Sequence, residues 1–358
     1  MTDDFTPKVF IVADDLTGAL DSAVAFAGAD TKVVVARHPG ALPEALAQRP
    51  DVLAVSTASR EIAEAEASAR VSEALAAVPL ARIPVVIKKV DSRLKGHPGA
   101  ETAVLADAMG APELIISPAI PDMGRVVRDG ALQGSGVATP IPIAPLFDDL
   151  PSCPVTCPDS ESAAQLDAAV AGATGRPLWV GARGLAMALA RHLGITAAPP
   201  PALDLPLMIA SGSRDPVTLA QLDALTAPVL DAPDGAVPQI PPGAIRVLSI
   251  RDGGGALSGA EAAGRFAAGT LRALDTLKPR ALMICGGETA HAILDQMRAD
   301  SLQVTAEFRP GLPLCRIAAP WGPLQLVTKS GGFGDPGLLQ EVLAEAATER
   351  GVREGEGA

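Results

Sequence analysis

The feature that most constrains this chain is an apolar segment, 9–13, that runs directly into two adjacent carboxylates, Asp14 and Asp15. Continuous apolar residues rich in β-branched side chains predict a buried parallel strand, followed by a helix over about 18–29. Because open α/β sheets bind ligands just beyond the carboxyl ends of their strands, we expect the acids to face a ligand. Helix capping explains one such acid but not an adjacent pair.

Length and charge indicate a protein that works on small molecules. At 358 residues the chain exceeds the ~250–300 residues at which a single core usually divides, so two domains are expected. The formal net charge of −12 argues against a nucleic-acid partner, since phosphate backbones need a basic surface. No apolar run long enough to cross a membrane and no secretory signal is apparent, so the expected location is the cytoplasm. The four cysteines lack metal-ligand spacing, so no protein metal site is predicted.

Predicted strands and helices alternate along the chain, which indicates an α/β fold. We expect two domains, each with a mainly parallel sheet flanked by helices, and an active site in the cleft between them. The segment 195–207 contains four prolines and is the predicted boundary between a domain at 1–200 and a domain at 205–350. Residues 129–158 are expected to be turns and irregular structure, and 351–358 a frayed tail.

Cationic residues gather where the predicted strand 83–90 ends. Lys88, Lys89, Arg93 and Lys95 fall within eight residues, just before a proline suited to the first turn of a helix. A charge run is usually only a solvated face. Because this one joins an apolar strand to a helix N-terminus, where anions are favoured, it predicts an anion-binding site.

Three loops of the second half, 211–215, 286–290 and 330–335, each follow a predicted strand. They offer small residues with free backbone N–H groups, the arrangement that cradles phosphate oxygens. The glycine loops match neither the P-loop nor the Rossmann spacing, and ordinary turns are the alternative. Three such loops at the strand ends of one domain favour a phosphate or nucleotide site.

Taken together, six segments resemble motifs of the four-carbon acid sugar kinase family, the ATP-dependent kinases of threonate, erythronate and 3-oxo-tetronate. The segments lie at 13–19, 88–96, 118–125, 211–213, 286–289 and 328–334, in the order of the family. The resemblance covers most of the chain. It implies that the N-terminal domain binds the sugar acid, that the C-terminal domain binds ATP, and that Mg²⁺ accompanies the nucleotide.

The resemblance also implies a phosphotransferase that moves the γ-phosphoryl group of ATP to a hydroxyl of a four-carbon acid sugar. One of Asp14, Asp15 and Asp91 is expected to accept the hydroxyl proton. The residues expected to bind the anionic substrate are Lys89, Ser92, Arg93, Lys95, Gly96 and Arg125. Those expected to bind ATP are Ser211, Ser213, Gly286, Gly287, Glu288, Thr289, Ser330, Gly331 and Gly332.

The chain departs from the family pattern at 92–96, where Ser-Arg-Leu-Lys-Gly replaces the usual Ser-Thr-Leu-Arg-Gly, and it is shorter than is usual. Lys95 lacks the planar fork of Arg, so Arg93 is the candidate to bind a carboxylate from a shifted position. Two alternatives stay open: a phosphatase of the haloacid-dehalogenase type, and a sugar-acid sensor without turnover. The oligomeric state is also open, with a homodimer as one option.

Overall fold

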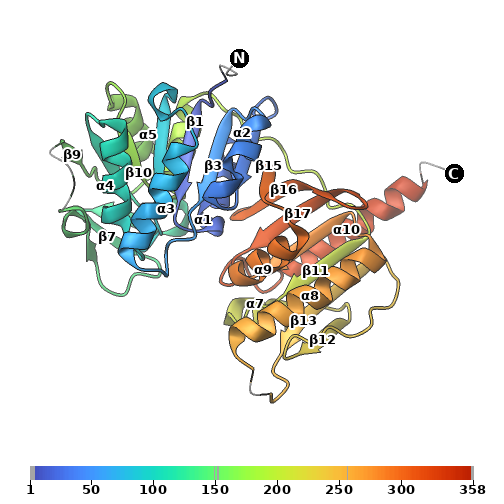
Figure 1. Cartoon of the computed structure of the whole chain (residues 1–358). Coiled ribbons are helices and arrows are strands. Elements are labelled where there is room, and N and C mark those ends of the chain that lie inside the picture. Colours follow the sequence, from blue (N-terminus) through green and yellow to red (C-terminus); the bar gives the residue numbers. More distant parts are fainter. Residues whose placement is uncertain (1–4, 149, 151–152, 256, 356–358) are drawn as a thin grey trace. The chain divides into compact units, whose positions relative to one another are not determined.

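The computed structural model describes residues 5–148, 150, 153–255 and 257–355. The chain forms two compact units, each with helices against a mainly parallel sheet (Figure 1). The first unit contains the described residues up to Ala198 together with Ser301–Thr305. The second contains Pro199–Asp300 and the described residues from Ala306 on. The α/β fold is therefore as predicted, whereas the return of Ser301–Thr305 to the first unit is not predicted from the sequence.

The first unit is built around β1 (Val9–Ala13), whose five residues are completely buried. Its parallel strands run in the order β2, β3, β1, β4, β10, β5 and β9. The bounds are β2 (Val33–Ala36), β3 (Val52–Ser56), β4 (Val85–Lys89), β5 (Leu114–Ser117), β9 (Val155–Thr156) and β10 (Leu178–Gly181). The chain winds from β1 to β2 and β3 on one side and then crosses to β4 on the other. The carboxyl ends of β1 and β4 thus form the switch point at which such sheets bind ligands.

Helices cover both faces of this sheet, since buried parallel strands are apolar on both sides. They are α1 (Leu16–Ala23), α2 (Leu42–Ala47), α3 (Glu64–Ala76), α4 (Pro98–Met109), α5 (Ala163–Gly172) and α6 (Arg183–His192). Helix α1 packs against α6, and α3 packs against α4. Phe10 and Val12, two apart on β1, join one core with Val71 of α3 and Leu105 of α4.

Short strands border the first unit where the sequence predicts mainly turns. Strands β6 (Arg125–Arg128), β7 (Ala131–Gly134) and β8 (Ile141–Pro142) form a small antiparallel sheet. Residues 149, 151 and 152 of the predicted irregular segment lie outside the described residues. At the edge of the main sheet, β15 (Ser301–Arg309) pairs antiparallel with β2, Ser301 opposite Ala36.

The second unit repeats the winding around β11 (Leu207–Ser211). Its strands run in the order β12, β13, β11, β14, β17 and β16, all parallel except β16. The bounds are β12 (Val229–Pro233), β13 (Ile245–Arg251), β14 (Ala281–Cys285), β16 (Leu312–Ala319) and β17 (Gly322–Lys329). The chain reaches β12 and β13 on one side of β11 before it crosses to β14. The second switch point therefore lies between β11 and β14.

The helices of this unit within the described residues are α7 (Pro216–Asp223), α8 (Gly259–Leu277), α9 (Gly287–Met297) and α10 (Leu338–Gly355). Helix α10 extends through 351–355 of the segment for which a frayed tail is predicted, and 356–358 lie outside the described residues. Among the helices that the structure describes, none has the length and apolar character to cross a membrane.

Candidate active site

The paired acids follow β1 directly but lie in different environments. The side chain of Asp14 is only 4% exposed, whereas that of Asp15 is 29% exposed. Asp15 caps α1, because its Oδ1 accepts a hydrogen bond from the Gly18 N–H at 2.6 Å. Helix α1 ends at Ala23, earlier than the sequence predicts. Capping accounts for Asp15, and a different partner holds Asp14.

That partner is Arg60, which is not among the residues predicted from the sequence. Its Nε and Nη2 donate to the two carboxylate oxygens of Asp14 at 2.7 and 3.0 Å. Its Nη1 donates to Asp15 Oδ2 at 2.7 Å, and Nη2 lies 3.7 Å from Asp91 Oδ2. One guanidinium therefore contacts all three carboxylates that the sequence nominates as proton acceptors.

The surroundings shift the pKa values of the two adjacent carboxyl groups in opposite directions. Burial opposes the ionisation of Asp14, but the hydrogen bonds and charge of Arg60, with Lys88 and Lys89, outweigh it and hold the pKa below its usual value. Burial raises the pKa of Asp15; Arg60 opposes this rise and the charge of Asp14 adds to it. Asp14 is the more firmly ionised of the pair.

The two lysines at the end of β4 have different roles. Lys88 is buried, and its Nζ forms an ion pair with Oε2 of the buried Glu101 at 2.6 Å, so the inclusion of Lys88 in the anion-binding cluster is wrong. Lys89 Nζ donates to the Val90 carbonyl at 2.9 Å. A Cβ atom on Gly18 would stand 3.0 Å from Lys89 Nζ, so this glycine makes room for the ammonium at the start of α1.

The loop after β4 carries the remaining predicted cations. Asp91 Oδ1 accepts hydrogen bonds from the backbone N–H groups of Arg93 and Lys95 at 2.9 and 3.3 Å, which shapes the loop. The side chains of Arg93 and Lys95 are exposed and form no ion pair within the described part of the chain. Gly96 has a φ of +78°, and a Cβ atom there would lie 3.4 Å from the Cα of Arg60. This loop therefore folds against Arg60.

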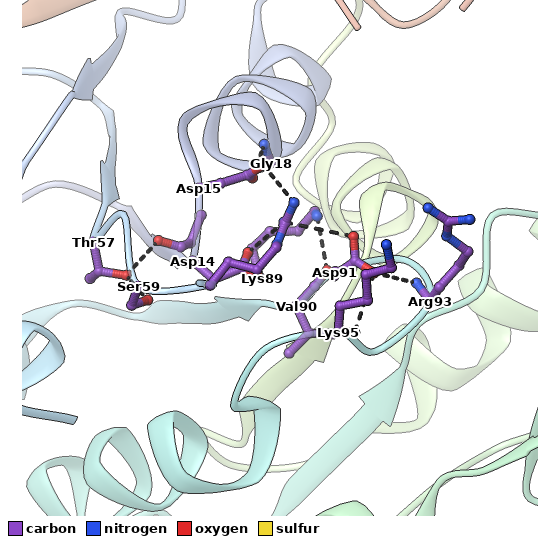
Figure 2. Close-up of polar contacts among 12 residues, drawn as sticks. Asp14, Asp15, Gly18, Thr57, Ser59, Lys89, Val90, Asp91, Arg93 and Lys95 are labelled. Atoms are coloured by element: carbon purple, nitrogen blue, oxygen red, sulfur yellow. Dashed lines mark hydrogen bonds and ion pairs between the residues drawn. The ribbon is translucent and has the colours of Figure 1, made fainter. Parts of the chain in front are cut away.

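Arg125, the first residue of β6, reaches the same loop. Its Nη1 donates to Ser92 Oγ at 2.6 Å and its Nε donates to the Ser135 carbonyl at 3.0 Å. Burial lowers the pKa of Arg125, and the nearby charge of Arg93 lowers it further. Figure 2 shows Arg93 at the opposite end of the group from Asp14. The first unit thus has a cationic end and an acidic end, built from the predicted Asp14, Asp15, Lys89, Asp91, Ser92, Arg93, Lys95, Gly96 and Arg125.

In the second unit, the three predicted loops follow β11, β14 and β17 and contact one another. A Cβ atom on Gly212 would lie 2.2 Å from Thr289 Oγ1, and one on Gly331 would lie 2.7 Å from Ser213 Oγ. Gly286 has a φ of +108° and caps α9. Such close approaches need glycine, and they place small residues and a helix N-terminus at the second switch point.

The other predicted residues of this group lie on the same loops. Gly287, Glu288 and Thr289 form the first turn of α9, Ser330 and Gly332 follow β17, and Ser211 ends β11. Ser211 is buried at the end of this strand. Within the described residues, no group of three or more His, Cys, Asp or Glu side chains could hold a metal ion.

Lys329, the last residue of β17, is buried and forms hydrogen bonds with the backbone of the loop 330–335. Its Nζ donates to Thr218 Oγ1 at 2.8 Å and to the carbonyls of Ser330 and Gly331, both at 3.1 Å. Burial lowers the pKa of Lys329, although Cys285 and Asp215 oppose the shift. These contacts fix the backbone that carries Gly331.

Sequence comparisons agree with this division of sites. Residues 9–156 match the family described as a sugar-binding N-terminal domain, and residues 246–339 match a nucleotide-binding C-terminal domain. A D-threonate kinase of Bordetella bronchiseptica is 30% identical over 95% of this chain and 97% of its own length. The chain belongs to the four-carbon acid sugar kinase family. A 3-oxo-tetronate kinase of Methylobacterium radiotolerans is 29% identical over 93% of this chain and 97% of its own.

Two solved structures share the fold of this family member. A protein of Salmonella typhimurium LT2 has a TM-score of 0.72 at 21% identity and covers 92% of this chain and 97% of its own. A protein of Haemophilus influenzae has a TM-score of 0.69 at 17% identity and covers 94% and 100%. At these identities the likeness shows the fold alone.

Arg60 is the residue of this family member that sequence reasoning missed. It lies in the loop after β3, and β3 is the strand next to β1. Carboxyl ends of neighbouring parallel strands meet at one edge of a sheet, so a lone arginine after β3 is a detectable signal. The loop that follows β3 has neither a charge run nor a glycine pattern, so the sequence alone does not distinguish it from an ordinary turn.

Proposed function

We propose that this protein transfers the γ-phosphoryl group of ATP to a hydroxyl of a four-carbon acid sugar. The observation that carries the proposal is the pairing of an acidic end and a cationic end at the switch point between β1 and β4, in a chain of the acid sugar kinase family. A short hydroxy acid has the matching chemistry, because it presents a carboxylate at one end and hydroxyls at the other.

The distribution of charge in the site determines how the sugar acid is oriented. Arg93, Lys95 and Arg125 supply positive charge at one end of the site, so the carboxylate of the sugar acid binds there through charge-assisted hydrogen bonds. Its hydroxyls then face Asp15, with the Lys89 ammonium beside the same helix start. The direction follows from the separation of Arg93 from the paired acids seen in Figure 2.

Asp15 is the best placed proton acceptor. Each Asp15 oxygen accepts one hydrogen bond, from the Gly18 N–H and from Arg60, but the carboxylate is 29% exposed, whereas that of Asp14 is only 4% exposed. As the hydroxyl oxygen gains the phosphoryl group, its proton passes to Asp15, and ADP leaves. Positioning and charge stabilisation provide most of the catalysis in such transfers. Asp91 is the reserve candidate, since its Oδ1 already accepts two backbone hydrogen bonds.

We assign ATP to the three loops of the second unit. The close approaches at Gly212 and Gly331 and the start of α9 provide backbone N–H groups and a positive helix end, which suit phosphates. When bound, ATP supplies the phosphoryl group. Mg²⁺ usually binds through substrate phosphates and few protein ligands, which fits the small number of acids on these loops. A cytoplasmic location, where ATP is plentiful, is part of the proposal.

The phosphatase alternative needs a carboxylate that is free to attack phosphorus. Asp14 is buried and Arg60 bonds both of its oxygens. The oxygens of Asp15 are held by the Gly18 N–H and by Arg60, which suits a fixed proton acceptor better than a nucleophile that must move onto phosphorus. The geometry therefore favours the kinase.

A coupled assay of ADP release tests the proposal, with Mg²⁺, ATP and a panel of D- and L-threonate, D- and L-erythronate and 3-oxo-tetronate. ADP release that depends on at least one of these acids is expected. Release at the same rate without any acid, or sugar-acid binding without turnover, would contradict the kinase and favour an ATPase or a sensor.

A further inference from the structure

Arg60 is the most heavily engaged side chain of the first unit's site. Its Nε and Nη2 bond Asp14, its Nη1 bonds Asp15, and Asp91 lies 3.7 Å from Nη2. The side chain is 20% exposed. All three guanidinium nitrogens therefore face carboxylates that already belong to the protein.

The loop that carries Arg60 is fixed to the end of β1. The N–H of Thr57 donates to the Ala13 carbonyl at 2.8 Å, and the N–H of Ser59 donates to the Asp14 carbonyl at 2.9 Å. Arg70 Nη1 donates to the carbonyl of Ala58 at 2.9 Å. Ala58 has a φ of +48°, a conformation that non-glycine residues rarely adopt. These hydrogen bonds attach the loop to the end of β1 and to α3.

The charges around Arg60 argue against a role in binding the substrate carboxylate. Arg60 already faces three carboxylates, which occupy its hydrogen-bond donors and would repel a further carboxylate beside it. The positive charges of Arg93 and Arg125 lie close enough to repel each other. Arg93 forms no ion pair within the described residues. A substrate carboxylate is therefore favoured near Arg93 and disfavoured near Arg60.

We propose that Arg60 is a positioning residue for phosphoryl transfer: it holds Asp14 and Asp15 in place, and it does not bind the carboxylate of the sugar acid. The inference rests on the proposed function. The charged groups that face Asp14 are Arg60 from the loop after β3, Asp15 from α1, and Lys88 and Lys89 from β4, while Asp91 faces Arg60. Removal of Arg60 leaves Asp14 buried beside Asp15 with only the lysines to oppose protonation.

The experiment compares Arg60→Met and Arg60→Lys with wild type in the full-length protein. Arg191→Met is the matched control, because Arg191 forms an exposed ion pair with Asp167 away from the acids. The first readout is the titration of Asp carboxyl carbons by ¹³C NMR, with the Asp14 signal assigned from Asp14→Asn. We expect the pKa of Asp14 to rise in Arg60→Met and to rise by less in Arg60→Lys, which keeps a positive charge. This readout does not depend on activity.

The second readout is steady-state kinetics with calorimetry of sugar-acid binding. A positioning role predicts that kcat falls about 10²-fold in Arg60→Met, that the acid limb of kcat/KM moves to higher pH, and that the sugar-acid Kd changes less than about threefold. If Arg60 binds the substrate carboxylate, Kd and KM rise while kcat holds, which overturns the inference. An unchanged Asp14 titration in a folded Arg60→Met protein also overturns it. If wild type phosphorylates no acid sugar, the proposed function fails while the NMR result still stands.

Discussion

The two acids after β1 differ in exposure and partners, so their substitutions should differ in effect. Asp15→Asn should lower kcat by about 10²–10⁴, because it removes basicity at the exposed carboxylate. Stability should hardly change, since Asn caps helices about as well as Asp. Asp14→Asn should lower kcat by less, because it weakens the hold on Arg60 but leaves the Asp15 carboxylate in place. Steady-state kinetics at saturating ATP measures both.

The comparison is informative only if both proteins remain folded, which thermal melting checks. Should Asp15→Asn keep the wild-type kcat while Asp91→Asn loses it, Asp91 is the proton acceptor and the paired acids only bind.

The pH dependence of turnover follows from the environment of Asp15. Burial raises the pKa of this carboxyl above 3.8, so it becomes protonated at a pH where a free Asp side chain is still ionised. A protonated carboxyl cannot accept a proton, so kcat/KM should fall as the pH decreases through that raised pKa. A profile measured between about pH 4 and 8 should show this limb, and Asp15→Asn should abolish it. An unaltered limb in Asp15→Asn would assign it to another group.

Among the elements, the loop after β17 makes the sharpest prediction for the nucleotide. In Gly331→Ala the new Cβ would stand 2.7 Å from Asp215 Cβ and from Ser213 Oγ, so the loop must shift. The ATP KM should rise far more than the sugar-acid KM. The matched control is Gly264→Ala on the exposed face of α8, where a Cβ meets nothing within 4 Å. Equal ATP KM values in two well-folded proteins would remove the loop from the nucleotide site.

The buried ion pair between β4 and α4 makes a stability prediction. Lys88→Met leaves the carboxylate of Glu101 without its partner in the core, which typically costs about 3–5 kcal/mol. Urea unfolding should show this loss, whereas Arg191→Met at the exposed pair with Asp167 should cost less than about 1 kcal/mol. Similar losses at the two positions would mean that Lys88 is solvated and available to an anion.

The strands and loops that the sequence predicts correctly are those with a local pattern. The apolar run of β1 and the charges after β4 are continuous in sequence, and the carboxyl ends of neighbouring strands meet by the rules of α/β sheets. The grouping of Lys88 with Lys89 fails because successive strand residues face opposite sides of a sheet. Only the tertiary structure shows that Glu101 lies on the face of the sheet to which the Lys88 side chain points.

Strands β15 and β16 are among those that the sequence analysis does not predict, and the reasons differ. In β15 the buried residues alternate strictly through Leu302, Val304, Ala306 and Phe308, a period-two signal that was present in the sequence. Strand β16 has a run of four buried residues at its start, which alone does not distinguish strand from loop. That the first part of β15 joins the first unit's sheet depends on strand pairing, which composition cannot show.

For the whole molecule, the pairing of β15 with β2 affects any division of the chain. A fragment of residues 1–198 lacks Ser301–Thr305, so the backbone edge of β2 at Val33–Ala36 is left open. An open edge strand invites pairing between copies. We expect this fragment to bind the sugar acid without turnover but to self-associate in gel filtration, and a peptide of residues 300–306 to reduce the association. A monomeric fragment that the peptide does not affect would contradict this role of β15.

The central claim is that the full chain joins the phosphoryl group of ATP to an acid sugar. The most direct measurement is ³¹P NMR of the protein with ATP, Mg²⁺ and the acid sugar that gives the fastest ADP release, with Asp15→Asn in parallel. We predict a new phosphomonoester signal that grows in step with ADP, requires the sugar acid, and is nearly absent in Asp15→Asn. Inorganic phosphate as the sole new signal, or its release from a phosphoester without ATP, would contradict the account.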